Sequence, residues 1–377
     1  MIPFNKPYLT GKELEYIQQA HANGQLAGDG PFTQKCHAWL EETIGCSKAL
    51  LTHSCTGALE MAALLANLQP GDEVIMPSFT FVSTANAFVL RGAVPVFVDI
   101  RPDTLNMDET KIEAALTPQT RAIVPVHYAG VGCEMDPILD IAQKHALWVF
   151  EDAAQGICSN YKDEPLGSFG NLAALSFHET KNIISGEGGA LLINQAKFVE
   201  RAEIIREKGT NRSRFFRGQV DKYTWVDLGS SFLPGEIVAA FLYAQMEQAW
   251  EITSRRLKLW ETYHQAFADL ELKGLVRRPF IPANCGHNAH MYYLLVKNAD
   301  QRNVLLDRLN KVEGINAVFH YLPLHLSPAG MKHGRTSGSL SNTENTGGRL
   351  LRLPMWIGLE DKQAEVIDRV KKTIQSS

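Results

Sequence analysis

Short apolar runs alternate with longer mixed segments through the first half of the chain. Apolar, strand-like runs occupy residues 73–76, 94–98, 122–126, 148–150, 173–177 and 190–193. Segments with helical periodicity lie between several of these runs, for example over residues 136–145. Alternation of this kind predicts an α/β fold in which helices cover a mostly parallel sheet.

The pattern changes on either side of this alternating region. Residues 12–44 show helical periodicity with a break at Gly28-Asp29-Gly30-Pro31, and another helix is expected from Thr56 to about residue 67. Beyond residue 235 the predicted elements are longer helices with few strands. They are helices over 236–246, 253–270, 302–312 and 361–373, and strands over 291–296 and 317–320.

These patterns predict a large domain over residues 1–246, which includes the N-terminal helical segment, and a smaller α+β domain over residues 247–377. Residues 330–348 are rich in Gly, Ser, Thr and Asn. We expect them to form an exposed loop that is mobile or covers the substrate.

Composition narrows the class of protein. The 377 residues are 45% hydrophobic and 21% charged, as in ordinary soluble globular proteins. A net charge of −4 provides no basic surface for nucleic acid. No apolar run reaches the roughly 18 residues that span a bilayer, and the N-terminus lacks a signal-peptide pattern. The six cysteines are scattered, so we expect reduced thiols and a cytoplasmic protein.

Two polar side chains follow predicted strands and suggest cofactor chemistry. The run that begins at Ala174 ends on Lys181, and the run before it delivers Glu151 and Asp152. Ligand sites in parallel sheets lie beyond the carboxyl ends of strands, so these groups are expected to meet. Pyridoxal 5′-phosphate (PLP) needs a lysine for its aldehyde and an acid for its pyridine nitrogen. A single lysine after a strand is usually a solvated surface residue. The prediction therefore depends on the lysine together with the acid and a phosphate site.

A candidate phosphate site precedes the helix at Thr56. The sequence Ser54-Cys55-Thr56 can cap that helix, and the free backbone N–H groups and helix dipole there favour a phosphate. An ordinary N-cap without a ligand is the alternative.

Seven further motifs extend over almost the whole chain. They are 71–77, 80–86, 92–99, 124–127, 151–156, 176–182 and 186–189. In combination they resemble the DegT/DnrJ/EryC1/StrS sugar aminotransferase family. The resemblance implies the aspartate-aminotransferase fold (PLP-dependent transferase fold type I), PLP as cofactor and a homodimer or higher oligomer that completes its sites at a subunit boundary.

Within the family, three segments are most similar to enzymes that aminate dTDP-4-keto-6-deoxyglucose in enterobacterial common antigen synthesis. These segments are 54–56, 206–213 and 318–325. The resemblance implies a nucleotide-linked 4-keto-6-deoxy sugar as substrate, dTDP-4-amino-4,6-dideoxygalactose as product and L-glutamate as amino donor.

The resemblance also assigns roles to individual residues. Lys181 would bond to the cofactor and move protons, and Asp152, with Glu151 as runner-up, would pair with the pyridine nitrogen. Phe81 would stack on the ring, although a core aromatic is the alternative for that position. The remaining cofactor contacts implied are Gln155 near the ring, and Thr56, Ser176 and the amide of Cys55 at the phosphate.

Two positions depart from the family pattern. Cys55 stands where many relatives have glycine. Ser231 stands where many relatives have an asparagine that reaches the phosphate from the neighbouring subunit. The cross-subunit contact is therefore expected from Ser231 directly, through water, or from Asn211 or Arg212.

On the substrate side, the resemblance implies that Tyr321 and His325 face the sugar. Five cations between residues 206 and 217, Arg212 among them, form either surface charge or a clamp for the nucleotide diphosphate or the donor carboxylate. Histidines at 287, 290, 320 and 325 have no acid or cysteine cluster beside them, so we expect no metal.

Other functions remain as alternatives. A PLP-dependent sugar dehydratase would lack the lysine, which is present here. A transaminase for a different nucleotide keto sugar, or a regulatory protein that binds PLP or a nucleotide, is also considered. A dinucleotide-dependent oxidoreductase would need a G-x-G-x-x-G turn, which the early strands lack.

Overall fold

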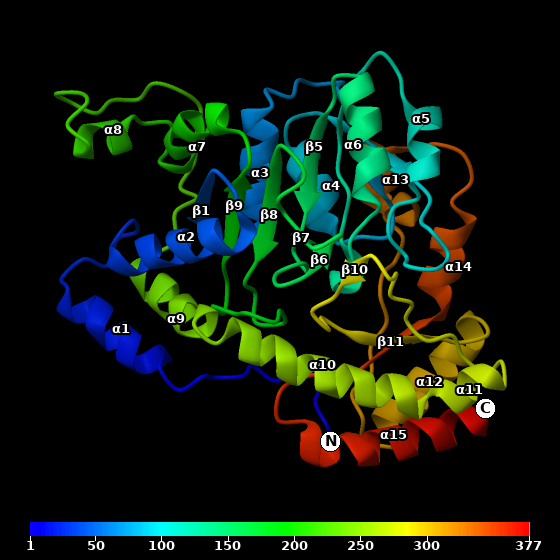
Figure 1. Ribbon diagram of the computed structural model, residues 1–377. Coiled ribbons are helices and arrows are strands. Elements are labelled where there is room, and N and C mark those ends of the chain that lie inside the picture. The colour runs from blue at the N-terminus through cyan, green and yellow to red at the C-terminus, as the bar shows by residue number, and fades with distance from the viewer. Residues whose placement is uncertain (377) are drawn as a thin grey trace.

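The main sheet of the protein is built from the apolar runs of the first half of the chain. The computed structural model describes residues 1–376. The sheet has eight strands in the order β1-β9-β8-β5-β4-β2-β3-β12 (Figure 1). The strands are β1 (Lys48–Thr52), β2 (Glu73–Pro77), β3 (Val94–Val98), β4 (Thr120–Ile123), β5 (Trp148–Asp152), β8 (Leu172–Ser176), β9 (Gly189–Ile193) and β12 (Arg335–Thr336).

The expected fold class is confirmed, because strands β5, β4, β2, β3 and β12 pair in parallel and only β9 runs against its neighbours. The central strands are apolar at nearly every position, and both faces are buried under helices. The covering helices are α3 (Cys55–Leu65), α4 (Val82–Val89), α5 (Ile112–Ala115), α6 (Met135–Lys144) and α7 (Val199–Arg206).

The N-terminal helices pack against a helix from later in the chain. Helix α1 (Glu13–Ala22) and helix α2 (Pro31–Ile44) both contact α9 (Glu236–Met246) (Figure 1). The predicted break between α1 and α2 is confirmed. Pro31 occupies the first turn of α2, where a missing N–H costs nothing, and Gly45 ends that helix in the left-handed region (φ 77°).

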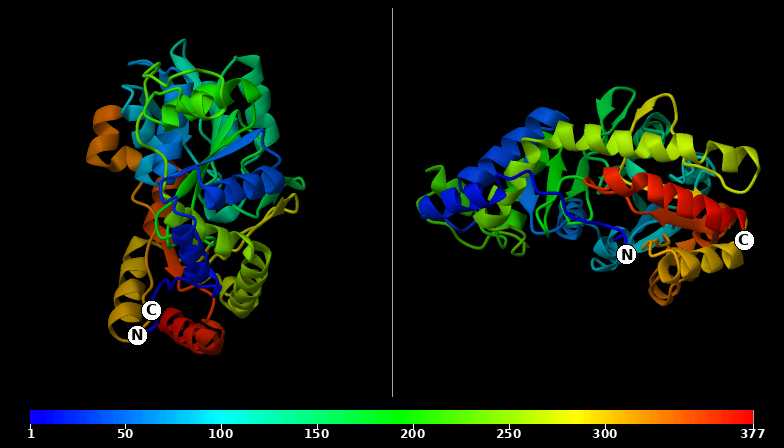
Figure 2. Two further views of the ribbon diagram at one scale, coloured as in Figure 1. Left: turned by 90° about the vertical axis from the view of Figure 1, so that its left-hand side faces the viewer. Right: turned by 90° about the horizontal axis from the view of Figure 1, so that it is seen from below.

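A second core forms around a two-stranded antiparallel sheet of β11 (Tyr292–Leu295) and β13 (Leu350–Leu353). Both chain ends lie on this side of the molecule (Figures 1 and 2). The surrounding helices are α10 (Ala249–Ala266), α11 (Ala268–Leu272), α12 (Ala299–Lys311) and α15 (Glu360–Gln375). The core between them is rich in aromatic side chains, including Trp260, Tyr263, Phe267 and Tyr292.

The prediction of an exposed loop over 330–348 is wrong. The segment contains β12 and most of α13 (Pro328–His333) and α14 (Ser341–Arg349). Asp99 at the end of the main sheet accepts hydrogen bonds from the first turn of α14, at the amides of Asn342 (3.0 Å) and Thr343 (2.8 Å). Arg335 pairs with Glu73 at 2.6 Å. The partners of this polar segment lie more than 200 residues earlier, so its local composition gave no sign of them.

Two short elements differ from the sequence expectations. Strand β1 was not predicted, and residues 317–320 form a single bridge from Val318 to Arg352 instead of a strand. The remaining elements are a small sheet of β6 (Asn160–Tyr161), β7 (Glu164–Pro165) and β10 (Cys285–Gly286), and helix α8 (Arg212–Phe216). Within residues 1–376, none of the helices combines the length and the apolar character needed to cross a bilayer.

Candidate active site

A cavity of about 510 Å³ lies beyond the carboxyl ends of β5 and β8. These strands are parallel neighbours in the main sheet, so the groups that follow them meet at one edge. Eight of the sequence-predicted residues line this cavity. They are Cys55, Thr56, Phe81, Asp152, Gln155, Ser176, Lys181 and Tyr321.

Asp152 ends β5 with its carboxylate at the cavity wall, where only 5% of the residue is exposed. Its Oδ2 accepts a 2.6 Å hydrogen bond from Thr84 Oγ1, and its Oδ1 accepts a longer one, 3.2 Å, from the amide of Ala154. These contacts fix the side chain and leave acceptor capacity toward the cavity, since a carboxylate has about four lone-pair sites.

Glu151, the runner-up, points to the other face of β5 because successive strand side chains alternate. Its carboxylate accepts hydrogen bonds of 2.7–2.8 Å from the amides of residues 167, 169 and 170. His127 Nε2 lies 2.9 Å from the same carboxylate. Glu151 is fully buried and does not line the cavity, so its carboxylate organises the turn before β8 and cannot reach a ligand there.

Lys181 stands in the turn after β8 and lines the same cavity as Asp152. Its ammonium makes no hydrogen bond or ion pair with any group in residues 1–376. Burial is the main cause that lowers the pKa of Lys181 below its ordinary value, and the charge of Arg352 acts in the same direction. A lowered pKa makes the neutral, nucleophilic amine more accessible near neutral pH.

The start of helix α3 forms the expected anion cradle. Ser54 is the N-cap and accepts a hydrogen bond from the amide of Gly57 at 3.0 Å. In the described chain, the amides of Cys55 and Thr56 donate to no other group. Strand β9 approaches so closely that a Cβ at Gly189 would lie 2.4 Å from the Cys55 nitrogen. The cradle therefore depends on the glycine that ends the Gly-rich run.

Phe81 and Tyr321 bring aromatic surface to the cavity. Phe81 is the N-cap residue of α4 and is 57% exposed, so its ring is not a core aromatic. Gln155 accepts from the amide of Ala129 (2.7 Å) and donates to the Tyr321 hydroxyl (3.3 Å). Burial raises the pKa of Tyr321 to about 12, so it presents a neutral phenol. The side-chain amide of Gln155 is thus engaged within the protein.

The cavity has a second wall that sequence reasoning missed. Phe4, His290, His320 and Arg352 come from segments far apart in the chain. His320 stacks on Tyr321 with ring centroids 3.7 Å apart. Its pKa is far below the ordinary value because of burial and the charges of Arg352 and Lys181. Of these four, only His320 could have been found from sequence, since it precedes Tyr321 in the segment 318–325 that carries the resemblance.

Three predicted residues lie away from this cavity. His325 is bonded to Ser78 Oγ (2.7 Å) and lies 3.2 Å from Glu344, so it ties η4 (Leu324–Leu326) to its neighbours and does not face the site. Arg212 is 3.6 Å from Glu207. Ser231 is exposed and forms a backbone bridge with Glu207.

The cationic stretch between residues 206 and 217 is not a free clamp within one chain. Each of its five cations has an acidic partner, at Asp29, Glu200, Glu203 or Glu207. Arg206 is almost completely buried. Its acidic partner, Asp29, lies in the break between α1 and α2. These ion pairs account for the positive charges of residues 206–217 without a bound ligand.

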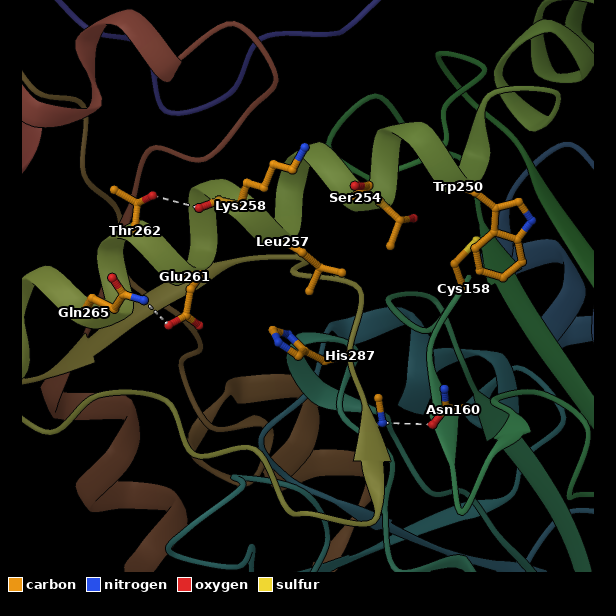
Figure 3. A pocket seen from close by; sticks show the side chains of 12 residues that line it. Cys158, Asn160, Trp250, Ser254, Leu257, Lys258, Glu261, Thr262, Gln265 and His287 are labelled. Carbon is orange, nitrogen blue, oxygen red and sulfur yellow. Dashed lines mark hydrogen bonds between the residues drawn. The ribbon is translucent and has the colours of Figure 1, made fainter.

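A second, wider cavity of about 780 Å³ lies between α10 and the paired strands β6 and β10 (Figure 3). Glu261 projects from α10 there, and His287 faces it from the opposite wall (Figure 3). The residues that line this cavity include neither the start of α3 nor the residues at the carboxyl ends of β5 and β8. It therefore does not fit a phosphorylated cofactor.

The first cavity does fit PLP. The α3 cradle with Thr56 and Ser176 suits a phosphate, Asp152 suits a protonated pyridine nitrogen and Lys181 suits the aldehyde. The exposed ring of Phe81 offers a face for stacking.

Comparisons with known proteins agree with this chemistry. A model of the DegT/DnrJ/EryC1/StrS aminotransferase family matches residues 7–371. Spore coat polysaccharide biosynthesis protein SpsC of Bacillus subtilis is 32% identical and aligns over 100% of this chain and 98% of its own. The structure is similar to that of Helicobacter pylori PseC, an aminotransferase involved in the biosynthesis of pseudoaminic acid, with 26% identity, a TM-score of 0.91 and 100% of both chains covered.

The fold is also that of the putative sugar aminotransferase Spr1654 from Streptococcus pneumoniae in its PLP form. That likeness has a TM-score of 0.91 and 24% identity, and covers 100% of this chain and 99% of the other.

Proposed function

This chain belongs to the DegT/DnrJ/EryC1/StrS aminotransferase family, and from that premise we propose that it transfers the amino group of L-glutamate to a nucleotide-linked 4-keto-6-deoxy sugar. The family fixes the coarser part of this statement: the protein is a PLP-dependent sugar aminotransferase of fold type I. The donor and the identity of the keto sugar are the proposed part.

The observation that carries the proposal is the meeting of Lys181 and Asp152 in one cavity, with the α3 cradle beside them. When bound, PLP supplies an electron sink that stabilises negative charge on the carbon attached to the transferred nitrogen. Asp152, held by Thr84, keeps the pyridine nitrogen protonated. The Lys181 ammonium, which has no hydrogen-bond or ion-pair partner in the described chain, would be free to take up and return a proton at the substrate carbon.

For the acceptor we propose dTDP-4-keto-6-deoxyglucose, converted to dTDP-4-amino-4,6-dideoxygalactose. The resemblance of residues 54–56, 206–213 and 318–325 to enzymes with that substrate supports this choice. The names of SpsC and PseC, which refer to spore coat polysaccharide biosynthesis and to the biosynthesis of pseudoaminic acid, also favour a role in carbohydrate synthesis. A different nucleotide keto sugar is the main alternative. A sugar dehydratase is disfavoured because Lys181 is present.

Purified protein should be yellow, and borohydride should remove the colour and fix the cofactor to Lys181. Peptide mass mapping checks the position. A panel of dTDP-, UDP- and GDP-linked keto sugars, assayed with glutamate, checks the substrate. We expect turnover of the dTDP-4-keto-6-deoxy sugar and an axial 4-amino product by NMR. A fixed cofactor on another lysine would reject the site, and preference for a UDP or GDP sugar would reject only the acceptor.

We propose further that the active species is a homodimer in the cytoplasm. Seven large apolar side chains between residues 215 and 237 are exposed in one chain, which is an unusual concentration for a free surface. They are Phe215, Phe216, Tyr223, Trp225, Val226, Leu228 and Ile237, and we call them the apolar arm. A second copy of this chain is the proposed occupant, which would bring Ser231 to its neighbour's cradle.

Trp225→Asp should therefore yield a monomer with little activity, because a charge would replace a side chain that is 76% exposed in one chain and buried in the dimer. Trp250, 61% exposed on α10 outside the arm, provides the matched control, Trp250→Asp, which should remain a dimer. Light scattering measures the molar mass of each variant and so distinguishes monomer from dimer.

Mixed dimers test the shared site. We expect one of the two sites of a heterodimer to be active when a Lys181→Ala chain pairs with a Ser231→Ala chain, if Ser231 acts on its neighbour. That site has its own Lys181 and receives Ser231 from the other chain. A fully active wild-type monomer would reject the shared site. An unimpaired Ser231→Ala homodimer would mean that the contact comes from another residue.

A further inference from the structure

His290 brings a hydrogen-bond acceptor without a donor to the active-site cavity. The residue lines the cavity and is only 6% exposed. Its Nε2 makes no hydrogen bond within residues 1–376, yet this nitrogen keeps some accessible surface. His320, another histidine of the cavity, has both ring nitrogens engaged, by the Tyr128 hydroxyl and by Arg352. The lone pair at Nε2 of His290 is therefore available to a ligand or to a mobile side chain.

Asn182 fixes the tautomer of His290. The side-chain amide of Asn182 donates from Nδ2 to the backbone oxygen of Asn288 (2.8 Å), so its Oδ1 is the atom that lies 3.0 Å from His290 Nδ1. An amide oxygen can only accept, so Nδ1 carries the proton. Burial, followed by the charge of Lys181, holds the pKa of His290 well below its ordinary value. The ring is therefore neutral, and Nε2 is an acceptor.

The backbone around His290 is held as firmly as its ring. The buried guanidinium of Arg256 donates to the backbone oxygens of Ala289 (3.1 Å) and His290 (2.7 Å). Asn288, which has no exposure, donates to the backbone oxygen of Gln155 at 2.8 Å. These contacts fix the position of the ring, so Nε2 stays at one place on the cavity wall.

A donor for this acceptor is present next to Asn182 in the chain. Lys181 lines the same cavity, and its ammonium has no hydrogen-bond or ion-pair partner within residues 1–376. Among the charges that lower the pKa of His290, that of Lys181 has the largest effect, which indicates that the two groups are close. The four-carbon side chain of lysine has the rotatable bonds to bring its amine to Nε2.

We propose that His290 Nε2 accepts a hydrogen bond from the amine of Lys181 whenever that lysine is not bonded to the cofactor, and so positions it for proton transfer. This inference rests on the proposed transaminase function, in which Lys181 is released while the cofactor holds the amino group. The proton stays on the lysine, since a neutral imidazole with a lowered pKa is the weaker base. His290 is thus a positioning residue, and Lys181 remains the group that moves the proton.

Nitrogen-15 NMR of histidine-labelled enzyme loaded with pyridoxamine 5′-phosphate tests the contact, because Lys181 is not bonded to that cofactor. The Nε2 resonance of His290 should be that of an unprotonated nitrogen that accepts a hydrogen bond. Lys181→Ala should shift it toward the value of a free lone pair. Lys311→Ala, on the exposed side of α12, is the control and should leave it unchanged. PLP-loaded wild-type enzyme, in which Lys181 is bonded, should resemble Lys181→Ala.

Two amide substitutions separate the acceptor from the contact with Asn182. Asparagine places its amide near the position of Nδ1 and keeps that contact, whereas glutamine places its amide near Nε2 and keeps an acceptor for the lysine. His290→Asn should lower kcat at least about tenfold with little change in the KM for glutamate, since a hydrogen bond to a charged group is lost. His290→Gln should retain more activity. His145→Asn, at the exposed end of α6, is the matched control and should behave as wild type.

The opposite order of the two variants, with His290→Gln less active than His290→Asn, would show that only the contact with Asn182 matters and would overturn the proposal. An Nε2 resonance that does not respond to Lys181→Ala would overturn it as well. Should both His290 variants unfold, the spectra of wild type and Lys181→Ala still decide. If Nε2 responds to Lys181 but no keto sugar is aminated, the positioning contact stands and the proposed function fails.

Discussion

Lys181→Ala is expected to lower turnover by at least about 10⁴-fold, because the substitution removes both the covalent anchor of the cofactor and the proton carrier of the reaction. The side-chain ammonium of Lys181 makes no hydrogen bond or ion pair within residues 1–376, so its removal should leave the melting temperature almost unchanged. The α3 cradle and Phe81 remain in place. The variant should still bind PLP, without the covalent bond that borohydride fixes.

Lys311→Ala is the matched control, since that lysine is exposed on α12 and, within residues 1–376, pairs with Asp307 alone. It should retain full activity. Steady-state assays and thermal unfolding are the measurements. A Lys181→Ala enzyme within about tenfold of wild-type turnover would show that another group moves the proton.

Asp152→Asn and Glu151→Gln should separate catalysis from stability at adjacent positions of β5. Asp152→Asn leaves a neutral amide where a charge must hold the pyridine nitrogen. Loss of one member of a buried, hydrogen-bonded charge pair costs about 2–5 kcal/mol, which corresponds to roughly 30- to 5,000-fold in turnover. The unfolding temperature should change little, because an amide oxygen can still accept from Thr84.

Glu151→Gln should have the opposite profile. The three backbone amides that now donate to the carboxylate would meet a side chain with only one acceptor oxygen, at a site with no exposure. We expect a loss of about 3–5 kcal/mol in unfolding free energy. The folded fraction should keep most of its specific activity. If Glu151→Gln instead abolished turnover with normal stability, the assignment of the acid would pass to Glu151.

The strand ends of the main sheet were predictable because they follow local rules. Apolar runs fixed β3, β5, β8 and β9 within one or two residues, and the groups after β5 and β8 had to meet at one edge. The same reasoning placed Lys181 and Asp152 in one cavity. Glu151 could not be separated from Asp152 by sequence alone, since the choice depends on which face of β5 each side chain occupies.

The second wall was beyond sequence reasoning for a physical reason. Phe4, His290 and Arg352 come from the N-terminus, the segment before β11 and strand β13, and they meet at the cavity only in the folded chain. No motif marks them. The contacts of His325 and of residues 330–348 are equally long-range. The division at residue 246, and the proposed roles of the cavity residues, stay predictions for the experiments above.

Strand β12 has a consequence for the newly synthesised chain. β3 pairs with β2 within a short stretch of sequence, but its outer partner, Arg335–Thr336, is made more than two hundred residues later. At about 5–20 residues per second, ribosomes leave that edge open for on the order of ten seconds or longer. An open edge strand can recruit other nascent chains. Pro95 lies within β3 and lacks an N–H, so it interrupts the row of donors and blunts the edge while the chain is incomplete.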